Sequence, residues 1–148
     1  MKPLQGIGVL VTRPAEQADR LLKMIRDLGG APQHLPVIAI VEMGNSLQID
    51  EKIRRLLEFD VVIFISANAV HKVIRYIDAH GGLPEKLSIA CVGAATANAL
   101  RQFGAEQVIY PKQQFNSEAL LDLPVFQSVQ RKKILIIRGE GGRDLLAK

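Results

Sequence analysis

The feature that most constrains this chain is a series of short apolar runs that are continuous rather than alternating. They are IGVLV at 7–11, VIAIV at 37–41, VVIFI at 61–65, IACV at 89–92, VIY at 108–110 and ILII at 134–137. A strand with one face in water alternates apolar and polar residues, whereas a strand buried on both faces does not. The runs therefore predict strands of parallel sheets that are covered on both sides.

Between these runs, apolar residues recur with helical spacing. The clearest stripe consists of Ala18, Leu21, Leu22, Ile25 and Leu28. Charged residues fill the opposite side, as in an amphipathic helix on a sheet, and the pair Gly29-Gly30 is expected to end it. Similar helices are expected in 47–59, in 68–80 and in 96–103, the last opened by Thr96. Strands alternating with helices predict an α/β fold with open parallel sheets and flanking helices.

Composition narrows the class of protein. The chain has 148 residues, 48% of them hydrophobic and 23% charged, which suits a globular core. It has no run of about 18 apolar residues that could cross a membrane, and the apolar run near its N-terminus is too short for a secretory signal. Its single cysteine, Cys91, excludes an internal disulfide and is expected to be an inert core thiol. These features predict a cytoplasmic protein without a membrane partner.

Charge and aromatic content bear on the ligand. Lysine and arginine outnumber aspartate and glutamate by 19 to 15, for a net charge of +4. A mild excess of this kind favours solubility or an anionic ligand. The chain has no block of basic residues and only 5% aromatic residues, so nucleic acid is not an expected partner.

Polar and small residues follow the expected strands, at the edge where α/β proteins bind ligands. The residues concerned are Thr12-Arg13, Ser66-Ala67-Asn68, Gly93-Ala94-Ala95-Thr96 and Arg138-Gly139-Glu140-Gly141-Gly142. Backbone N–H groups at helix N-termini suit carboxylates or phosphates, and arginine adds bidentate contacts. The structural alternative is that Ser66, Asn68 and Thr96 only cap helices.

Several enzyme classes lack their motifs here. The turn VTRPAEQ has no GxGxxG pattern, and no GxxxxGK[ST] pattern occurs. No aspartate follows an expected strand, as a phosphoacceptor would require. The histidines are His34, His71 and His80. Their spacing predicts no metal site and no Ser-His-Asp set, so we expect no metal and no cofactor.

Five segments together carry a family likeness. They are VLVTRPAEQADRLLKMIRDLGGAPQHLPVIAI, IFISANAVHKVI, ACVGAATANALRQFGAEQVIYP, NSEALLDL and ILIIRGEGGRDLLA. In order and spacing the chain resembles uroporphyrinogen-III synthases over essentially its whole length. One departure is Ile65, where the family usually has threonine before the serine. Family members continue beyond the position of Lys148, so the resemblance implies that this chain is the front part of something longer.

The resemblance implies a protein of two flavodoxin-like lobes. Residues 1–33 would be the N-terminal βα segment of lobe one, whose remainder would lie beyond residue 148. Residues 34–148 would form lobe two. The stretch GGAPQHLP at 29–36, rich in glycine and proline, agrees with a boundary there.

The resemblance also implies an activity, namely cyclisation of hydroxymethylbilane to uroporphyrinogen III with inversion of ring D and loss of water, in heme biosynthesis. Thr96 is expected to assist departure of the hydroxyl group. The residues expected to bind substrate are Ser66, Ala67, Asn68, Gly93, Ala94, Ala95, Arg13 and Arg138. The full-length protein is expected to be a monomer.

Two other functions remain open from the residues. A non-catalytic α/β module could bind an anionic metabolite. A sugar-phosphate isomerase would need a base at a strand end, where Glu140 is the one candidate. We further expect that residues 1–148 alone are inactive. We also expect self-association, because the stripe on the helix over 15–28 would lack its sheet and face solvent.

Overall fold

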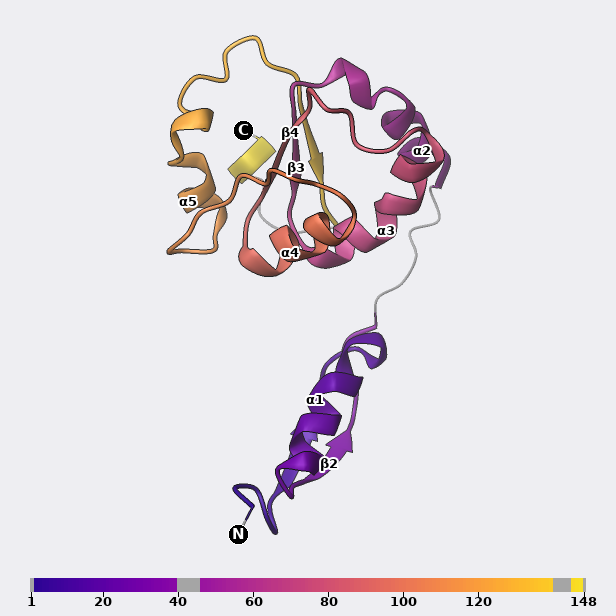
Figure 1. The fold of residues 1–148 in the computed structure, drawn as a ribbon, viewed down its shortest axis with the longest axis vertical. Coiled ribbons are helices and arrows are strands. Elements are labelled where there is room, and N and C mark those ends of the chain that lie inside the picture. The colour runs from indigo at the N-terminus through magenta and orange to yellow at the C-terminus, as the bar shows by residue number, and fades with distance from the viewer. Residues whose placement is uncertain (1, 40–45, 140–144, 148) are drawn as a thin grey trace. The chain divides into compact units, whose positions relative to one another are not determined.

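The computed structural model describes residues 2–39, 46–139 and 145–147 (Figure 1). The chain divides into two compact units, Met1–Gly44 and Asn45–Lys148. Residues 34–39, which the sequence assigned to the second lobe, lie in the first of these units. The division of residues between the lobes of the family stays a prediction.

The first unit is one strand–helix–strand element. Strand β1 (Gly8–Val11) leads into helix α1 (Ala15–Asp27), which returns the chain to strand β2 (Ala31–His34). The two strands pair in parallel, with Gly8 opposite Ala31. The sequence predicted β1 and α1 correctly.

Most of the apolar stripe of α1 is buried rather than exposed. Ala18, Leu22 and Ile25 form a cluster with Val11 of β1, and only Leu28, beyond the end of the helix, is as much as 41% exposed. The expectation that this stripe would face solvent is therefore wrong, because two strands are enough to cover it. The opposite face of β1 is the open one, since Leu10 is 57% exposed.

Strand β2 corrects the sequence analysis. The segment 29–36 was interpreted as an interruption, and the strand was expected in 37–41. Residues 35–39 form no strand, and 40–41 lie outside the described residues. Proline is tolerated in β2 because a neighbouring residue donates the hydrogen bond to β1. The Ala31 N–H donates to the Ile7 carbonyl at 2.9 Å. Pro32 has no N–H to give, and at an edge strand none is needed there.

The second unit is built around a three-stranded parallel sheet. Strands β3 (Val61–Phe64), β4 (Ser88–Cys91) and β5 (Ile134–Ile137) lie in the order β4-β3-β5. All four residues of the central strand β3 are buried. The expected strand over 108–110 is reduced to a single parallel bridge between Ala90 and Ile109.

Helices cover both faces of this sheet. They are α2 (Ser46–Arg54), α3 (Ala67–Ala79), α4 (Ala94–Gln102) and α5 (Ser117–Leu121), with 3-10 turns η1 (Leu56–Glu58), η2 (Pro124–Phe126) and η3 (Leu145–Ala147). In Figure 1, α5 lies on the other side of the sheet from α2 and α3. None of the helices in the described ranges is long and apolar enough to cross a membrane.

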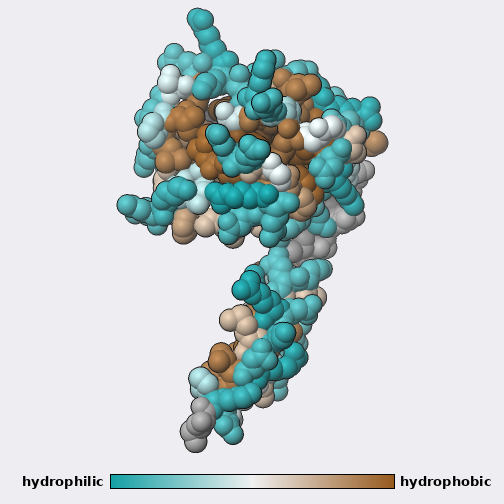
Figure 2. Space-filling view, in the orientation of Figure 1, coloured by the Kyte–Doolittle hydropathy of each residue, from teal (hydrophilic) through white to brown (hydrophobic). Residues whose placement is uncertain are grey.

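The two faces of β3 contribute to two separate cores. Val62 and Phe64 pack with residues of α2, α3 and α4, whereas Val61 and Ile63 pack with Leu120 of α5 and the 3-10 turn η2. Figure 2 shows apolar residues between polar ones on the visible surface of this unit. The predicted α/β fold with parallel sheets and flanking helices is confirmed.

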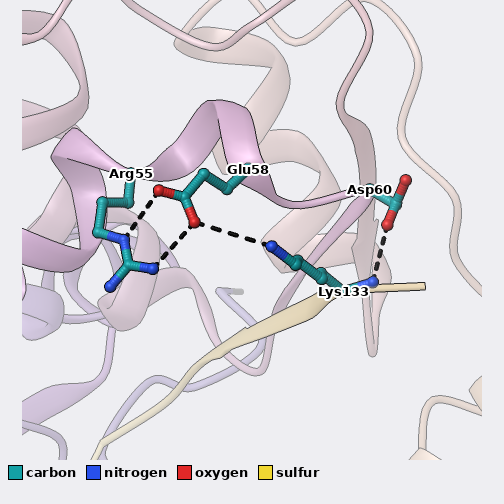
Figure 3. A network of polar contacts seen from close by, with 4 residues as sticks. All are labelled: Arg55, Glu58, Asp60 and Lys133. Atoms are coloured by element: carbon teal, nitrogen blue, oxygen red, sulfur yellow. Dashed lines mark hydrogen bonds and ion pairs between the residues drawn. The ribbon is translucent and has the colours of Figure 1, made fainter. Parts of the chain in front are cut away.

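A polar network joins the beginnings of β3 and β5 (Figure 3). The Lys133 N–H donates to Asp60 Oδ2 at 2.7 Å, and the Asp60 N–H donates to the Lys133 carbonyl at 2.9 Å. Glu58 accepts two hydrogen bonds from Arg55, both 2.9 Å long, and lies 3.9 Å from Lys133 Nζ. The hydrogen bond from Arg55 holds the pKa of Glu58 below its ordinary value. These contacts fix the register of two strands whose first residues are far apart in sequence.

We predict that Asp60→Ala lowers the free energy of unfolding by about 1 kcal/mol, the net value of one hydrogen bond that the Lys133 N–H would lose. Asp60→Asn keeps an acceptor oxygen at the same place and serves as the matched control. Urea unfolding monitored by circular dichroism measures both. Equal losses in the two variants would contradict a role for the hydrogen bond.

Candidate functional site

The candidate site lies at the carboxyl edge of the larger sheet. Phe64 of β3 is level with Cys91 of β4 and with Ile137 of β5. The segments that follow these three residues therefore emerge at one edge. These segments contain eight of the nine site residues that the sequence predicted, namely Ser66, Ala67, Asn68, Gly93, Ala94, Ala95, Thr96 and Arg138.

Ser66 is the residue that caps α3. Its backbone is extended, and its Oγ accepts a hydrogen bond of 3.2 Å from the Ala69 N–H. The capping interpretation of Ser66 is thus confirmed. Ala67 and Asn68, in the first turn of α3, are half-buried.

Helix α4 begins differently, because its N-cap has no side chain. Gly93 has extended backbone angles, with φ of −158°, which any residue adopts. The glycine leaves space for a neighbour: a Cβ atom here would lie 3.3 Å from Cβ of Phe115, closer than most such contacts. The side chain of Phe115 is 56% exposed and packs over this turn.

The first turn of α4 leaves backbone donors at the sheet edge. The helical hydrogen bonds begin with the Ala97 N–H, which donates to the Gly93 carbonyl at 3.0 Å. The N–H groups of Ala94 and Ala95 come before this bond; Ala94 is half-buried and Ala95 is exposed. A helix N-terminus with small side chains suits a carboxylate, because N–H groups and the helix dipole both favour negative charge.

Thr96 does not open α4, as the sequence suggested. The helix begins at Ala94 with Gly93 as N-cap, so the capping alternative for Thr96 is wrong. Thr96 is the third residue of the helix and is 5% exposed. Its side chain is thus buried within the first turn, one residue after the N–H groups described above.

The two predicted arginines lie in different units. Arg138 follows β5 at the edge of the larger sheet and is exposed. Arg13 belongs to the first unit, where its guanidinium donates to Gln17 Oε1 at 3.3 Å and its carbonyl is 3.0 Å from His34 Nε2. The alternative base Glu140 lies outside the described residues.

Cys91 is fully buried at the end of β4. Burial raises the pKa of its thiol, and its Sγ donates a weak hydrogen bond to the Gly93 carbonyl at 3.5 Å. This environment fits the expected inert thiol. Within the described ranges, no three residues among histidine, cysteine, aspartate and glutamate are grouped to hold a metal ion.

Sequence reasoning missed two features of the segment that follows Ile109. One is Phe115, which packs over Gly93. The other is Tyr110, which has the cations of Arg101 and Lys112 on its ring. Tyr-Pro-Lys at the end of a predicted strand is the signal that could have drawn attention to the second feature.

The fold and the site define a class: a parallel α/β protein with small residues and helix N–H groups at a strand edge, suited to an anionic ligand. Comparison with known proteins narrows the class to one family. A family model described as "Uroporphyrinogen-III synthase HemD" matches residues 19–148. The chain belongs to the uroporphyrinogen-III synthase family.

Curated relatives agree over nearly the whole chain. A uroporphyrinogen-III synthase of Escherichia coli (strain K12) is 30% identical over 141 residues, which are 95% of this chain and 57% of the relative. The synthase of Proteus mirabilis is 32% identical over 143 residues, or 95% of this chain and 71% of the relative. The chain thus spans little more than half the length of the first of these relatives.

A solved structure supports the fold. The uroporphyrinogen III synthase from the extremely thermophilic bacterium Thermus thermophilus matches with a TM-score of 0.56 at 18% sequence identity. The match covers 95% of this chain and 55% of the solved chain. At this identity the likeness concerns the fold alone.

We predict that Ser66→Ala lowers the free energy of unfolding of the larger unit by about 1 kcal/mol, because the Ala69 N–H loses its capping oxygen. Ser66→Asp, which restores an acceptor at the N-terminus of α3, is expected to keep wild-type stability. Thermal unfolding in parallel measures both variants. A Ser66→Ala variant as stable as the wild type would show that the cap contributes nothing.

Proposed function

We propose that this chain is part of an enzyme that cyclises hydroxymethylbilane to uroporphyrinogen III, with inversion of ring D and loss of water. Family membership carries the proposal, and the carboxyl edge of the larger sheet fits it. Hydroxymethylbilane is a linear tetrapyrrole with eight carboxylates. The backbone donors of the first turn of α4 and the net charge of +4 suit such a ligand.

The proposed chemistry needs little from acidic or basic side chains. The pyrrole nitrogen assists loss of the terminal hydroxyl group and leaves an electrophilic azafulvene. Ring D attacks through its substituted carbon, and the spiro intermediate rearranges to the inverted ring. The bilane also closes without an enzyme, to the uninverted isomer. The enzyme must therefore fold the chain and hold the electrophile, which is catalysis by positioning and preorganised electrostatics.

In this proposal the N-termini of α3 and α4 both contact the substrate. The N–H groups near Ala67, Asn68, Ala94 and Ala95 hold carboxylates of the substrate. Thr96 assists departure of the hydroxyl group through a hydrogen bond. Because Thr96 is 5% exposed, this role requires the substrate to reach a side chain that is almost fully buried.

Several further expectations stay predictions. Residues 1–148 by themselves are proposed to be inactive, because the matched relatives are longer. Self-association of this chain is proposed through the open face of β1, where Leu10 is 57% exposed. The Arg13 and Arg138 side chains are proposed to add positive charge for the substrate. The buried free thiol of Cys91 fits the proposed cytoplasmic location.

The product of the reaction tests the proposal. Hydroxymethylbilane is incubated with residues 1–148 and, separately, with the product of the complete reading frame that contains them. We expect the second preparation to give mainly the type III isomer without added cofactor, measured by chromatography of the oxidised products. Formation of the type I isomer alone would refute the activity and leave the non-catalytic binding module. A requirement for metal would also refute the proposed mechanism.

We predict that Thr96→Val in the active preparation lowers kcat by about 5- to 150-fold, since a hydrogen bond aimed at a transition state contributes about 1–3 kcal/mol. Valine keeps the shape of threonine and removes the hydroxyl. Thr96→Ser keeps the hydroxyl and is expected to retain most of the activity. A Thr96→Val enzyme with normal turnover and a lower melting temperature would show that the hydroxyl is structural.

A further inference from the structure

A tyrosine ring with two cations lies beside the candidate site. Lys112 Nζ is 3.8 Å from the centre of the Tyr110 ring, and Arg101 Cζ is 5.4 Å from it. The nearby ammonium of Lys112, and after it the guanidinium of Arg101, lower the pKa of Tyr110. The ring thus gathers one cation from α4 and one from the segment that follows Ile109.

The side chains of Arg101 and Lys112 have N–H donors available for a further hydrogen-bond acceptor. Neither Arg101 nor Lys112 forms an ion pair with a carboxylate within residues 2–39, 46–139 and 145–147, in contrast to pairs such as Arg54–Asp50 and Arg55–Glu58. Arg101 directs one N–H to Asn98 Oδ1 at 3.2 Å, and arginine has five N–H donors while lysine has three. An anion could therefore bind these two side chains without breaking an ion pair there.

The position of this cluster links it to the carboxyl edge of the sheet. The Ile109 N–H donates to the Ile89 carbonyl, and the Ile109 carbonyl accepts from the Cys91 N–H, both at 2.9 Å. Tyr110 and Lys112 follow directly, where the chain leaves this edge. Both cations act electrostatically on Cys91, the last residue of β4. The same segment then brings Phe115 against Gly93, the N-cap of α4.

We propose that Arg101 and Lys112 bind a carboxylate of the ligand, with the Tyr110 ring holding the two cations in place. Naming that ligand as hydroxymethylbilane rests on the proposed function, whereas carboxylate binding itself does not. The cluster adds side-chain cations to a site whose other donors are backbone N–H groups. A guanidinium and an ammonium together give a carboxylate stronger hydrogen bonds than neutral donors give. The competing explanation is a structural one, in which the ring and cations only attach α4 to the following segment.

Citrate is a suitable probe for residues 1–148, because it is a colourless polycarboxylate. The chain has two tyrosines, and the second supplies an internal control. Arg75 donates to the Tyr76 hydroxyl at 3.2 Å and lies 5.0 Å from its ring. Citrate is added at neutral pH and constant ionic strength, with sodium chloride in the parallel titration, and NMR follows the arginine N–H and tyrosine ring signals.

We expect the signals of Arg101 and Tyr110 to shift with citrate and reach saturation, whereas those of Arg75 and Tyr76 do not. Lys112→Gln should weaken citrate binding about three- to ten-fold, the scale of one charge-assisted contact on an exposed site. Lys86→Gln removes the same charge before β4, at the opposite edge of the sheet, and should leave binding unchanged. Shifts of equal size at both tyrosines, no saturation, or equal weakening by the two variants would overturn the proposal.

The assignment to the substrate has its own test in the active preparation. Lys112→Gln is expected to raise KM for hydroxymethylbilane about three- to ten-fold by the same reasoning, with kcat unchanged. Citrate binding together with an unchanged KM would overturn the assignment to substrate. If no uroporphyrinogen III forms at all, the proposed function fails, and the citrate titration still decides whether the cluster binds carboxylates.

Discussion

Burial of β3 on both faces is the constraint on which the larger unit depends. Its four residues alternate between two cores, one against α2, α3 and α4 and the other against α5 and the turn η2. A parallel strand in this position needs a partner on each side, and β4 and β5 supply them. β5 comes from a distant part of the sequence, and the bond from the Lys133 N–H to Asp60 supports its register beside β3.

The same register creates the candidate site. Parallel strands that start level also end level, so the turns after β3, β4 and β5 meet at one edge. The turns are not equivalent, however. Ser66 uses its hydroxyl to cap α3, whereas the N-cap of α4 is Gly93, whose missing side chain makes room for Phe115. The N-terminus of α3 therefore has a side-chain cap, whereas that of α4 has none.

In the first unit, one helix packs on a sheet of two strands. Helix α1 needs only two strands to bury Ala18, Leu22 and Ile25. What two strands leave open is the other face, where Leu10 is exposed. Self-association of this chain stays a prediction, with this face of β1 as the proposed contact surface.

Sequence alone determined the fold class and most of the elements, and tertiary structure decided the details of the site. Continuous apolar runs such as 61–65 identify buried parallel strands, and helical stripes identify α1, α3 and α4, because burial of a strand or helix imposes a period on the sequence. The sequence also carried the family resemblance, which the comparisons confirm. The strand at 31–34 was not predicted, since its pairing with β1 depends on which N–H groups face the partner, and periodicity carries no such information.

The site shows the same limit. Thr96 was expected to open its helix, yet the N-cap is Gly93 and Thr96 is buried in the first turn. The approach of Phe115 to Gly93 and of the two cations to Tyr110 joins residues through turns with no periodic pattern. Such contacts are set by the path of the chain over the finished sheet, so only the folded structure could reveal them.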